Sequence, residues 1–231
     1  MTSRLAPAGR ARGSEPGDDP MTPVLPVGCV IAVLGAPGTG KTELAQALMA
    51  RLLQRGIDAE LVADDTGGAS HEHAHAQTLR IAAAAQRGVV VADSTALSKA
   101  VAAELRSGDT TLYEHALAAH RTHAVTLLMA LDLPPAPGAA PHGHTEAEKA
   151  DALLRAALAR AGSPYAVIHG RGPERLASAW NAINARAEDA GVSASSGRAA
   201  QGERAWFWPC DKCSDPACEH RLFQDLIARR G

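Results

Sequence analysis

The clearest chemical signal in the sequence is a run of eight residues that matches the phosphate-binding loop pattern G-x-x-x-x-G-K-[ST]: Gly35, Ala36, Pro37, Gly38, Thr39, Gly40, Lys41 and Thr42. Glycines let backbone N–H groups approach phosphate oxygens closely. Lys41 is expected to bind the β and γ phosphates and to act in catalysis, and Thr42 to offer its hydroxyl to Mg²⁺. All eight residues are therefore predicted to bind a nucleotide.

The residues on either side of this run favour a phosphate site over an ordinary strand–turn–helix corner. An apolar, β-branched stretch, 27–34, precedes it and predicts a buried strand. A helical pattern, 41–55, follows it and ends at Gly56. Strand, glycine-rich loop and helix form the context that such a loop requires, because the helix N-terminus adds its positive dipole end.

Acidic residues follow two other predicted strands. Asp93 ends the apolar stretch 89–93, where phosphate-loop proteins place the acid that holds Mg²⁺ or organises the acceptor. Capping of the next helix is the alternative for Asp93. Asp64, with Asp65, follows the stretch 59–63; in many small kinases this strand lies beside the phosphate-loop strand, and its acid takes the acceptor's proton. A solvated loop is the alternative for Asp64.

The order of the elements predicts an α/β fold. Apolar stretches alternate with helical patterns, which indicates a parallel sheet of about five strands with helices on both faces, the three-layer sandwich of P-loop NTPases. Ligands bind such sheets at the carboxyl ends of the strands. The expected strands are 27–34, 59–63, 89–93, 125–131 and 165–169, and the expected helices are 41–55, 70–87, 95–106, 111–120, 145–161 and 174–187.

Composition and patterning divide the chain of 231 residues into four regions. Hydrophobic residues make up 46% of the chain, which suits a soluble globular protein with a substantial core. The net charge of -2 gives no signal for binding to nucleic acid or to a membrane. With no secretory leader evident, a cytoplasmic location is expected. The predicted regions are a disordered tail at 1–24, with Met21 as a possible start, the P-loop domain at 25–187, a linker at 188–204, and a Cys-rich tail with a terminal helix at 205–231.

Two sets of residues have the types and spacing of possible transition-metal ligands. In the tail, a C-x2-C pair and two further ligands could close a tetrahedral zinc site, with reduced thiols as the alternative: Cys210, Cys213, Cys218 and His220. Earlier in the chain, His71 and His75 share one helix face, but a solvated polar face is the favoured interpretation.

One stretch argues against efficient phosphoryl transfer. Residues 133–144, where a closing lid is expected, contain neither Arg nor Lys to neutralise phosphate charge. The sequence therefore leaves two functions open. The first is an ATP- and Mg²⁺-binding ATPase or a kinase-like protein that acts on a small, nucleoside-type acceptor. The alternative is a non-catalytic, nucleotide-dependent sensor or adaptor whose zinc-binding tail contacts a protein partner.

Three motifs carry a resemblance to a known family. The stretches Val-Val-Val-Ala-Asp-Ser-Thr-Ala-Leu (89–97), Leu-Leu-Met-Ala-Leu-Asp-Leu-Pro (127–134) and Tyr-Ala-Val-Ile-His-Gly (165–170) resemble the NadR-like AAA-type ATPases, which are related to ribosylnicotinamide kinase domains. The resemblance implies ATP with Mg²⁺ at the phosphate loop, a substrate acid at Asp93, and a nucleotide-base pocket near Gly170 and Arg175. The sequence departs from the family at residues 71–75 and 135–144, on the acceptor and lid side.

Overall fold

The computed structural model describes residues 22–63, 68–133 and 143–195. The chain divides into two units, Met1–Ala194 and Ser195–Gly231, and the architecture below is that of the first. Asp64, Asp65 and the Cys-rich tail therefore lie outside the described residues, as do most of the predicted N-terminal tail and linker.

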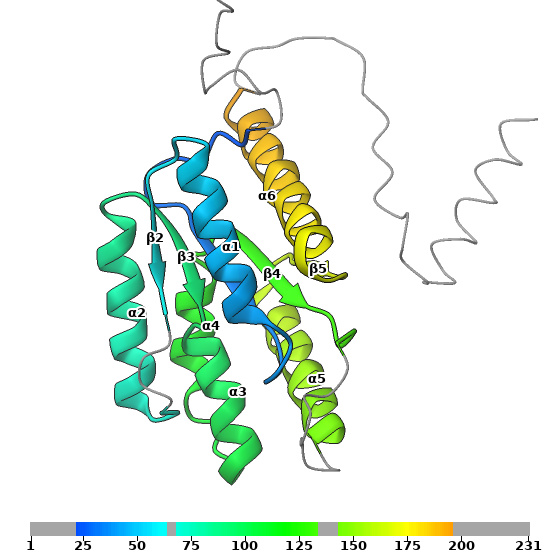
Figure 1. The fold of residues 1–231 in the computed structure, drawn as a ribbon. Helices are drawn as coiled ribbons and strands as arrows, with labels where there is room; N and C mark the ends of the chain where they lie inside the picture. The colour runs from blue at the N-terminus through cyan, green and yellow to red at the C-terminus, as the bar shows by residue number, and fades with distance from the viewer. Residues whose placement is uncertain (1–21, 64–67, 134–142, 196–231) are drawn as a thin grey trace, which may run out of the picture. The chain divides into compact units, whose positions relative to one another are not determined.

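Strands and helices alternate along the chain as the sequence predicts (Figure 1). The strands are β1 (Val30–Leu34), β2 (Ala59–Val62), β3 (Val89–Asp93), β4 (Val125–Met129) and β5 (Ala166–Ile168). The helices are α1 (Lys41–Gln54), α2 (His71–Ala85), α3 (Ala96–Ser107), α4 (Tyr113–His120), α5 (Gly143–Ala161) and α6 (Gly172–Ser195).

The five strands form one parallel sheet in the order β2-β3-β1-β4-β5. This confirms the α/β fold of P-loop type, with the phosphate-loop strand β1 at the centre. In the register, Val33 of β1 lies opposite Asp93 of β3 and Leu127 of β4. One expectation is wrong: β2, which leads to Asp64, is an edge strand and does not lie beside β1, because β3 is inserted between them.

Alternate residues of the central strands bury opposite faces, so helices cover both sides of the sheet (Figure 1). On one face of the sheet, Ile31 and Val33 of β1 pack against α1 and α6. Leu48 of α1 is fully buried there, and Trp180 of α6 is 2% exposed. The other face packs against α2, α3, α4 and α5, with Leu34 contributing from β1. Such two-sided burial explains why β1, β3 and β4 are nearly all apolar.

Several element boundaries differ from the predicted ones. β1 begins at Val30 rather than residue 27, because Gly28 turns the chain with φ +91° and the Cys29 N–H donates to the Pro26 carbonyl at 3.1 Å. β4 ends at Met129 rather than residue 131. α6 continues to Ser195, so the first eight residues of the predicted linker 188–204 are helical. Of the helices in the described residues, none is long and apolar enough to span a bilayer.

Candidate functional site

The phosphate loop connects β1 directly to α1 and adopts a backbone that its glycines make possible. Gly38 and Gly40 both have φ +77°, in the left-handed region. Gly40 is the N-cap of α1 and, as a glycine, has no side chain to accept a hydrogen bond from the first-turn N–H groups. A helix N-terminus left in this state is a ready anion site, because its free N–H groups and dipole point outward.

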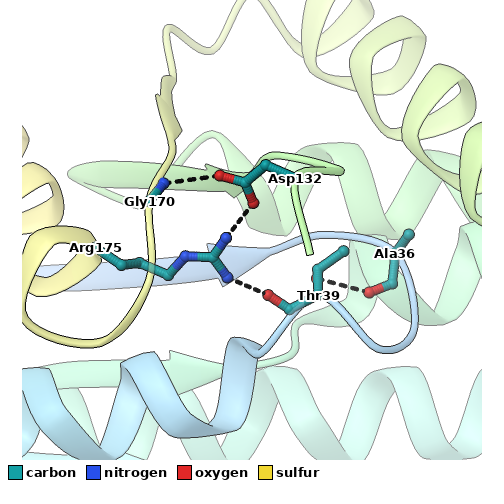
Figure 2. Close-up of polar contacts among 5 residues, drawn as sticks. All are labelled: Ala36, Thr39, Asp132, Gly170 and Arg175. Carbon is teal, nitrogen blue, oxygen red and sulfur yellow. Dashed lines mark hydrogen bonds and ion pairs between the residues drawn. The ribbon is translucent and has the colours of Figure 1, made fainter. Parts of the chain in front are cut away.

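The carbonyl of Ala36 holds the loop closed. The Thr39 hydroxyl donates to it at 2.8 Å, and Lys41 Nζ donates to it at 2.9 Å (Figure 2 shows Ala36 and Thr39). The lysine therefore lies across the loop, next to the N–H groups that would face a phosphate. The predicted contact of Lys41 with the β and γ phosphates stays a prediction.

Residues from two predicted motifs share one cavity of about 380 Å³ beside the loop. Lys41 and Thr42 line it from the phosphate loop, and Asp93 lines it from the end of β3. Asp93 is only 6% exposed, yet no other residue in the described part of the chain forms a hydrogen bond or ion pair with its carboxylate. Because Asp93 lines the cavity, its side chain is positioned to meet a ligand there.

The backbone at the end of β3 is strained. Ser94, next to Asp93, has φ +103°, and it is the only residue other than glycine with positive φ among those described. The buried Gln77 donates to the Ser94 carbonyl at 3.0 Å and so helps to hold this conformation. Such strain concentrates at functional sites, where the surrounding structure enforces it.

Arg175 connects the phosphate loop to two other strand ends (Figure 2). Its guanidinium donates to the Thr39 carbonyl at 2.6 Å and forms an ion pair with Asp132, just beyond β4. Asp132 in turn accepts a hydrogen bond from the Gly170 N–H at 2.7 Å. The Arg175 side chain is 6% exposed, and its Nε has no partner among the described residues.

This geometry gives Arg175 a structural task that the sequence did not indicate. The resemblance placed it in a base pocket; the structure places it against the loop backbone, 136 residues from its partner Thr39. It also lines a second cavity of about 400 Å³, whose lining includes Gly40, Leu133 and Pro173. Its predicted contact with a nucleotide stays a prediction.

Sequence reasoning missed two buried polar residues of α3. Lys99 is 2% exposed and donates to the Gly68 carbonyl at 3.1 Å, and the Ser98 hydroxyl is buried without a partner among the described residues. Ser98 lines the same cavity as Asp93. Their positions within a helix that directly follows Asp93 were the one available signal.

His71 and His75 of α2 do not line this cavity. His71 Nε2 lies 3.0 Å from the Thr111 hydroxyl, and Thr111 donates two hydrogen bonds that lower the pKa of Asp109. His75 packs against His115 instead, with ring centroids 5.5 Å apart. No group of three or more metal-ligating side chains occurs within the described ranges. Asp64 and the four candidate zinc ligands, Cys210, Cys213, Cys218 and His220, lie outside them.

Comparison with known proteins identifies a family. A family model described as an AAA domain matches residues 30–175. Two similar solved structures are a NadR protein in complex with NR (TM-score 0.49, 18% identity, 78% of this chain and 54% of that chain) and a NadR protein in complex with NAD and AMP-PNP (TM-score 0.48, 18% identity, 78% and 52%). This chain thus spans about half the length of each. No curated protein matches it.

Proposed function

Since the chain belongs to the AAA domain family, whose model matches residues 30–175, we propose that it binds ATP with Mg²⁺ and passes the terminal phosphoryl group to a small acceptor or to water. The observation that carries the proposal is the meeting of Lys41, Thr42 and Asp93 in one cavity beside a glycine-rich helix N-terminus. These residues supply the cation, the hydroxyl and the carboxylate that phosphoryl transfer uses.

The phosphates would bind to the loop Gly35–Thr42. The uncapped N–H groups of the first turn of α1 offer donors, and Lys41 can exchange its bond to the Ala36 carbonyl for a bond to phosphate oxygen. The exchange is favourable because a charge-assisted hydrogen bond to phosphate is stronger than one to a neutral carbonyl. The loop itself is kept in place by Thr39, through its bonds to Ala36 and Arg175.

The oxygen donors in the cavity fit Mg²⁺. Thr42 is exposed at the start of α1, and Asp93 lines the cavity from the end of β3, so both would hold the ion directly or through water. Mg²⁺, when bound, neutralises the charge that builds up on the phosphate oxygens. The carboxylate of Asp93 has a second possible task, to accept the proton of the attacking hydroxyl.

The test is calorimetry of ATP binding in the presence of Mg²⁺ with the Lys41→Ala variant. Loss of the cation should weaken binding about 100-fold, which corresponds to ~2.7 kcal/mol. The matched control is Lys149→Ala, because Lys149 is an exposed lysine of α5 outside the cavity. Equal ATP affinity in Lys41→Ala and the unmodified protein would contradict the proposal.

A sensor without turnover is the second candidate function, and one observation favours it. Lys41 is the only Arg or Lys among the residues that line this cavity in the described part of the chain, and residues 133–144 contain none. Assays of phosphate release and phosphoryl transfer separate the two functions: ATP binding with no turnover indicates the sensor.

Zinc in the tail stays a separate prediction, tested by metal analysis of the protein and of Cys213→Ser.

A further inference from the structure

The cavity beside the phosphate loop has one aliphatic wall. Four residues of α3 line it at helical spacing i, i+3, i+4 and i+7, so they form one stripe of that helix: Ser98, Val101, Ala102 and Leu105. Ala150 and Leu154 of α5 continue the wall at spacing i, i+4. Val101 and Leu154 also belong to the hydrophobic core, so the wall is rigidly supported.

The polar groups of the cavity lie at the strand ends and at the start of the wall. Lys41 and Asp93 are the charged residues among its described lining, one of each sign. The Ser98 hydroxyl is buried without a hydrogen-bond partner among the described residues, one turn of α3 before Val101. A hydroxyl left in this state is available to a ligand, because satisfying it recovers about 1–3 kcal/mol of desolvation cost.

This lining limits the chemistry of an acceptor. An anionic acceptor would need a cation, and Lys41 is required by the phosphates. A nucleoside would need partners for the donors and acceptors of its base, each of which costs about 1–3 kcal/mol when buried unpaired. The described wall of α3 and α5 offers one hydroxyl and no aromatic ring on which a base could stack.

We propose that the acceptor is an uncharged alcohol with a compact aliphatic body, rather than a nucleoside. The inference rests on the proposed phosphoryl transfer and specifies its substrate. The aliphatic body packs against Val101, Ala102 and Leu154, and the hydroxyl lies between Asp93 and the phosphate loop. A cavity of about 380 Å³ holds such a molecule in addition to a terminal phosphate.

The transfer balances with the groups at hand. The acceptor oxygen forms a bond to the terminal phosphorus of ATP, and the bond from that phosphorus to the bridging oxygen breaks. ADP leaves with the electron pair, and the hydroxyl proton passes to the carboxylate of Asp93. The products are ADP and the phosphate monoester of the alcohol.

The experiment uses the full chain with ATP and Mg²⁺. Isoamyl alcohol and cyclohexanol are compared as acceptors with uridine and glycerate, and the phosphate ester is detected by phosphorus NMR while ADP is counted in a coupled assay. The expected result is a kcat/KM for the two alcohols at least about tenfold above that for uridine. A preference for uridine or glycerate overturns the inference and leaves the proposed function intact.

A matched pair of variants tests the wall itself. Ala102→Phe fills the cavity and should raise the KM for isoamyl alcohol about tenfold, whereas Ala118→Phe, the same change at an exposed position of α4, should leave it unchanged. Ala102→Leu is the milder variant, and ATP binding by calorimetry shows that each variant is folded. An unchanged KM in both Ala102 variants overturns the inference, as does ATP binding without ester from either alcohol. Absence of ATP binding in the unmodified protein overturns the proposed function as well.

Discussion

Arg175 fixes the shape of the phosphate loop from a distance. Its guanidinium contacts the Thr39 carbonyl and the Asp132 carboxylate at the same time, and Asp132 also holds the Gly170 N–H. One planar group thus fixes the loop after β1 relative to the strand ends of β4 and β5. Arginine suits this task because its donors are arranged in a rigid fork, whereas a lysine presents a single point charge.

Replacing Arg175 should weaken nucleotide binding even though its bonds are to the protein. In Arg175→Lys the ammonium can reach only one of its two partners, so the loop is held less firmly and the free energy of binding should fall by about 1–2 kcal/mol. Arg175→Ala also leaves Asp132 without its ion pair, so thermal stability should drop. Calorimetry with ATP and melting curves measure both effects.

Arg171, exposed in the same segment, provides the control for Arg175. Arg171→Lys keeps the charge in that segment and should change neither the ATP affinity nor the melting temperature. A full ATP affinity in Arg175→Ala would show that the loop holds its shape without this contact.

Two neighbouring histidines make stability depend on pH. His120 is 1% exposed, its Nε2 lies 3.1 Å from the Thr126 hydroxyl, and burial lowers its pKa from 6.5 to about 4. Burial and then the neighbouring His120 lower the pKa of His123 to about 3. Both side chains are thus neutral in the folded protein at pH values where the unfolded chain binds protons.

The free energy of unfolding should therefore fall as the pH drops from 6.5 towards 4. Each histidine contributes a slope of about 1.4 kcal/mol per pH unit over this range, because the unfolded state takes up a proton that the folded state does not. Urea unfolding at several pH values measures this slope. In the double variant His120→Gln, His123→Gln, the slope of the unfolding free energy against pH should be smaller by the contribution of the two histidines. A slope equal to that of the unmodified protein would show that other groups cause the acid sensitivity.

The residue-level outcome shows what local sequence can indicate. Lys41, Thr42 and Asp93 meet as predicted, because their motifs fix each one to the end of a strand and parallel strand ends share one edge of the sheet. The pairing of Asp132 with Arg175 was not predicted. That contact spans 43 residues of sequence and depends on the direction of a side chain, which periodicity does not encode.

At the scale of elements, the phosphate loop depends on how closely it approaches β4. A Cβ added to Gly35 would lie 2.7 Å from Met129 Cβ and 2.8 Å from the Thr39 hydroxyl. Backbone or core atoms would have to move to admit it, because such distances are shorter than van der Waals contact. Gly38 differs: nothing lies within 4 Å of an added Cβ, although its φ of +77° disfavours other residues.

These two glycines therefore form a matched pair for mutation. Gly38→Ala should cost about 1–2 kcal/mol of stability, because it carries only the left-handed backbone penalty. Gly35→Ala should cost more and should also weaken ATP binding, because it displaces Thr39 or β4 beside the phosphate cradle. Melting curves and ATP calorimetry compare the two variants. Equal losses of stability and of ATP affinity would show that Met129 can move aside without cost.

The strands and helices were predicted more completely than the order in which the strands pair. Apolar stretches located all five strands, because strands buried on two faces are nearly all apolar. The position of β2 at the edge was missed, because hydrophobicity does not specify which strands pair. The last helix was ended too early, since Gly191 and the serines after it suggested a linker, yet α6 continues to Ser195.

At the scale of the whole molecule, cavity size does not identify the functional end. A cavity of about 470 Å³ lies at the amino ends of β1 and β4 and is lined largely by apolar residues of the stretch Val24–Cys29. The smaller cavity at the carboxyl ends holds Lys41 and Asp93. Chemistry and strand polarity together favour the carboxyl ends for the proposed nucleotide site, as expected for an open parallel sheet.

Because the described residues of the candidate site all lie between Gly35 and Arg175, a chain that ends at Ser195 should still bind ATP. Binding only to the folded state at 100 times Kd adds ~2.7 kcal/mol of stability, or roughly 5–10 °C in Tm. The ATP-induced rise in Tm should therefore be the same, within about 1 °C, for the truncated and the full chains. Lys41→Ala in the truncated chain should abolish the rise. A rise that is lost on truncation alone would show that residues 196–231 contribute to nucleotide binding, which favours the sensor over the independent kinase-like domain.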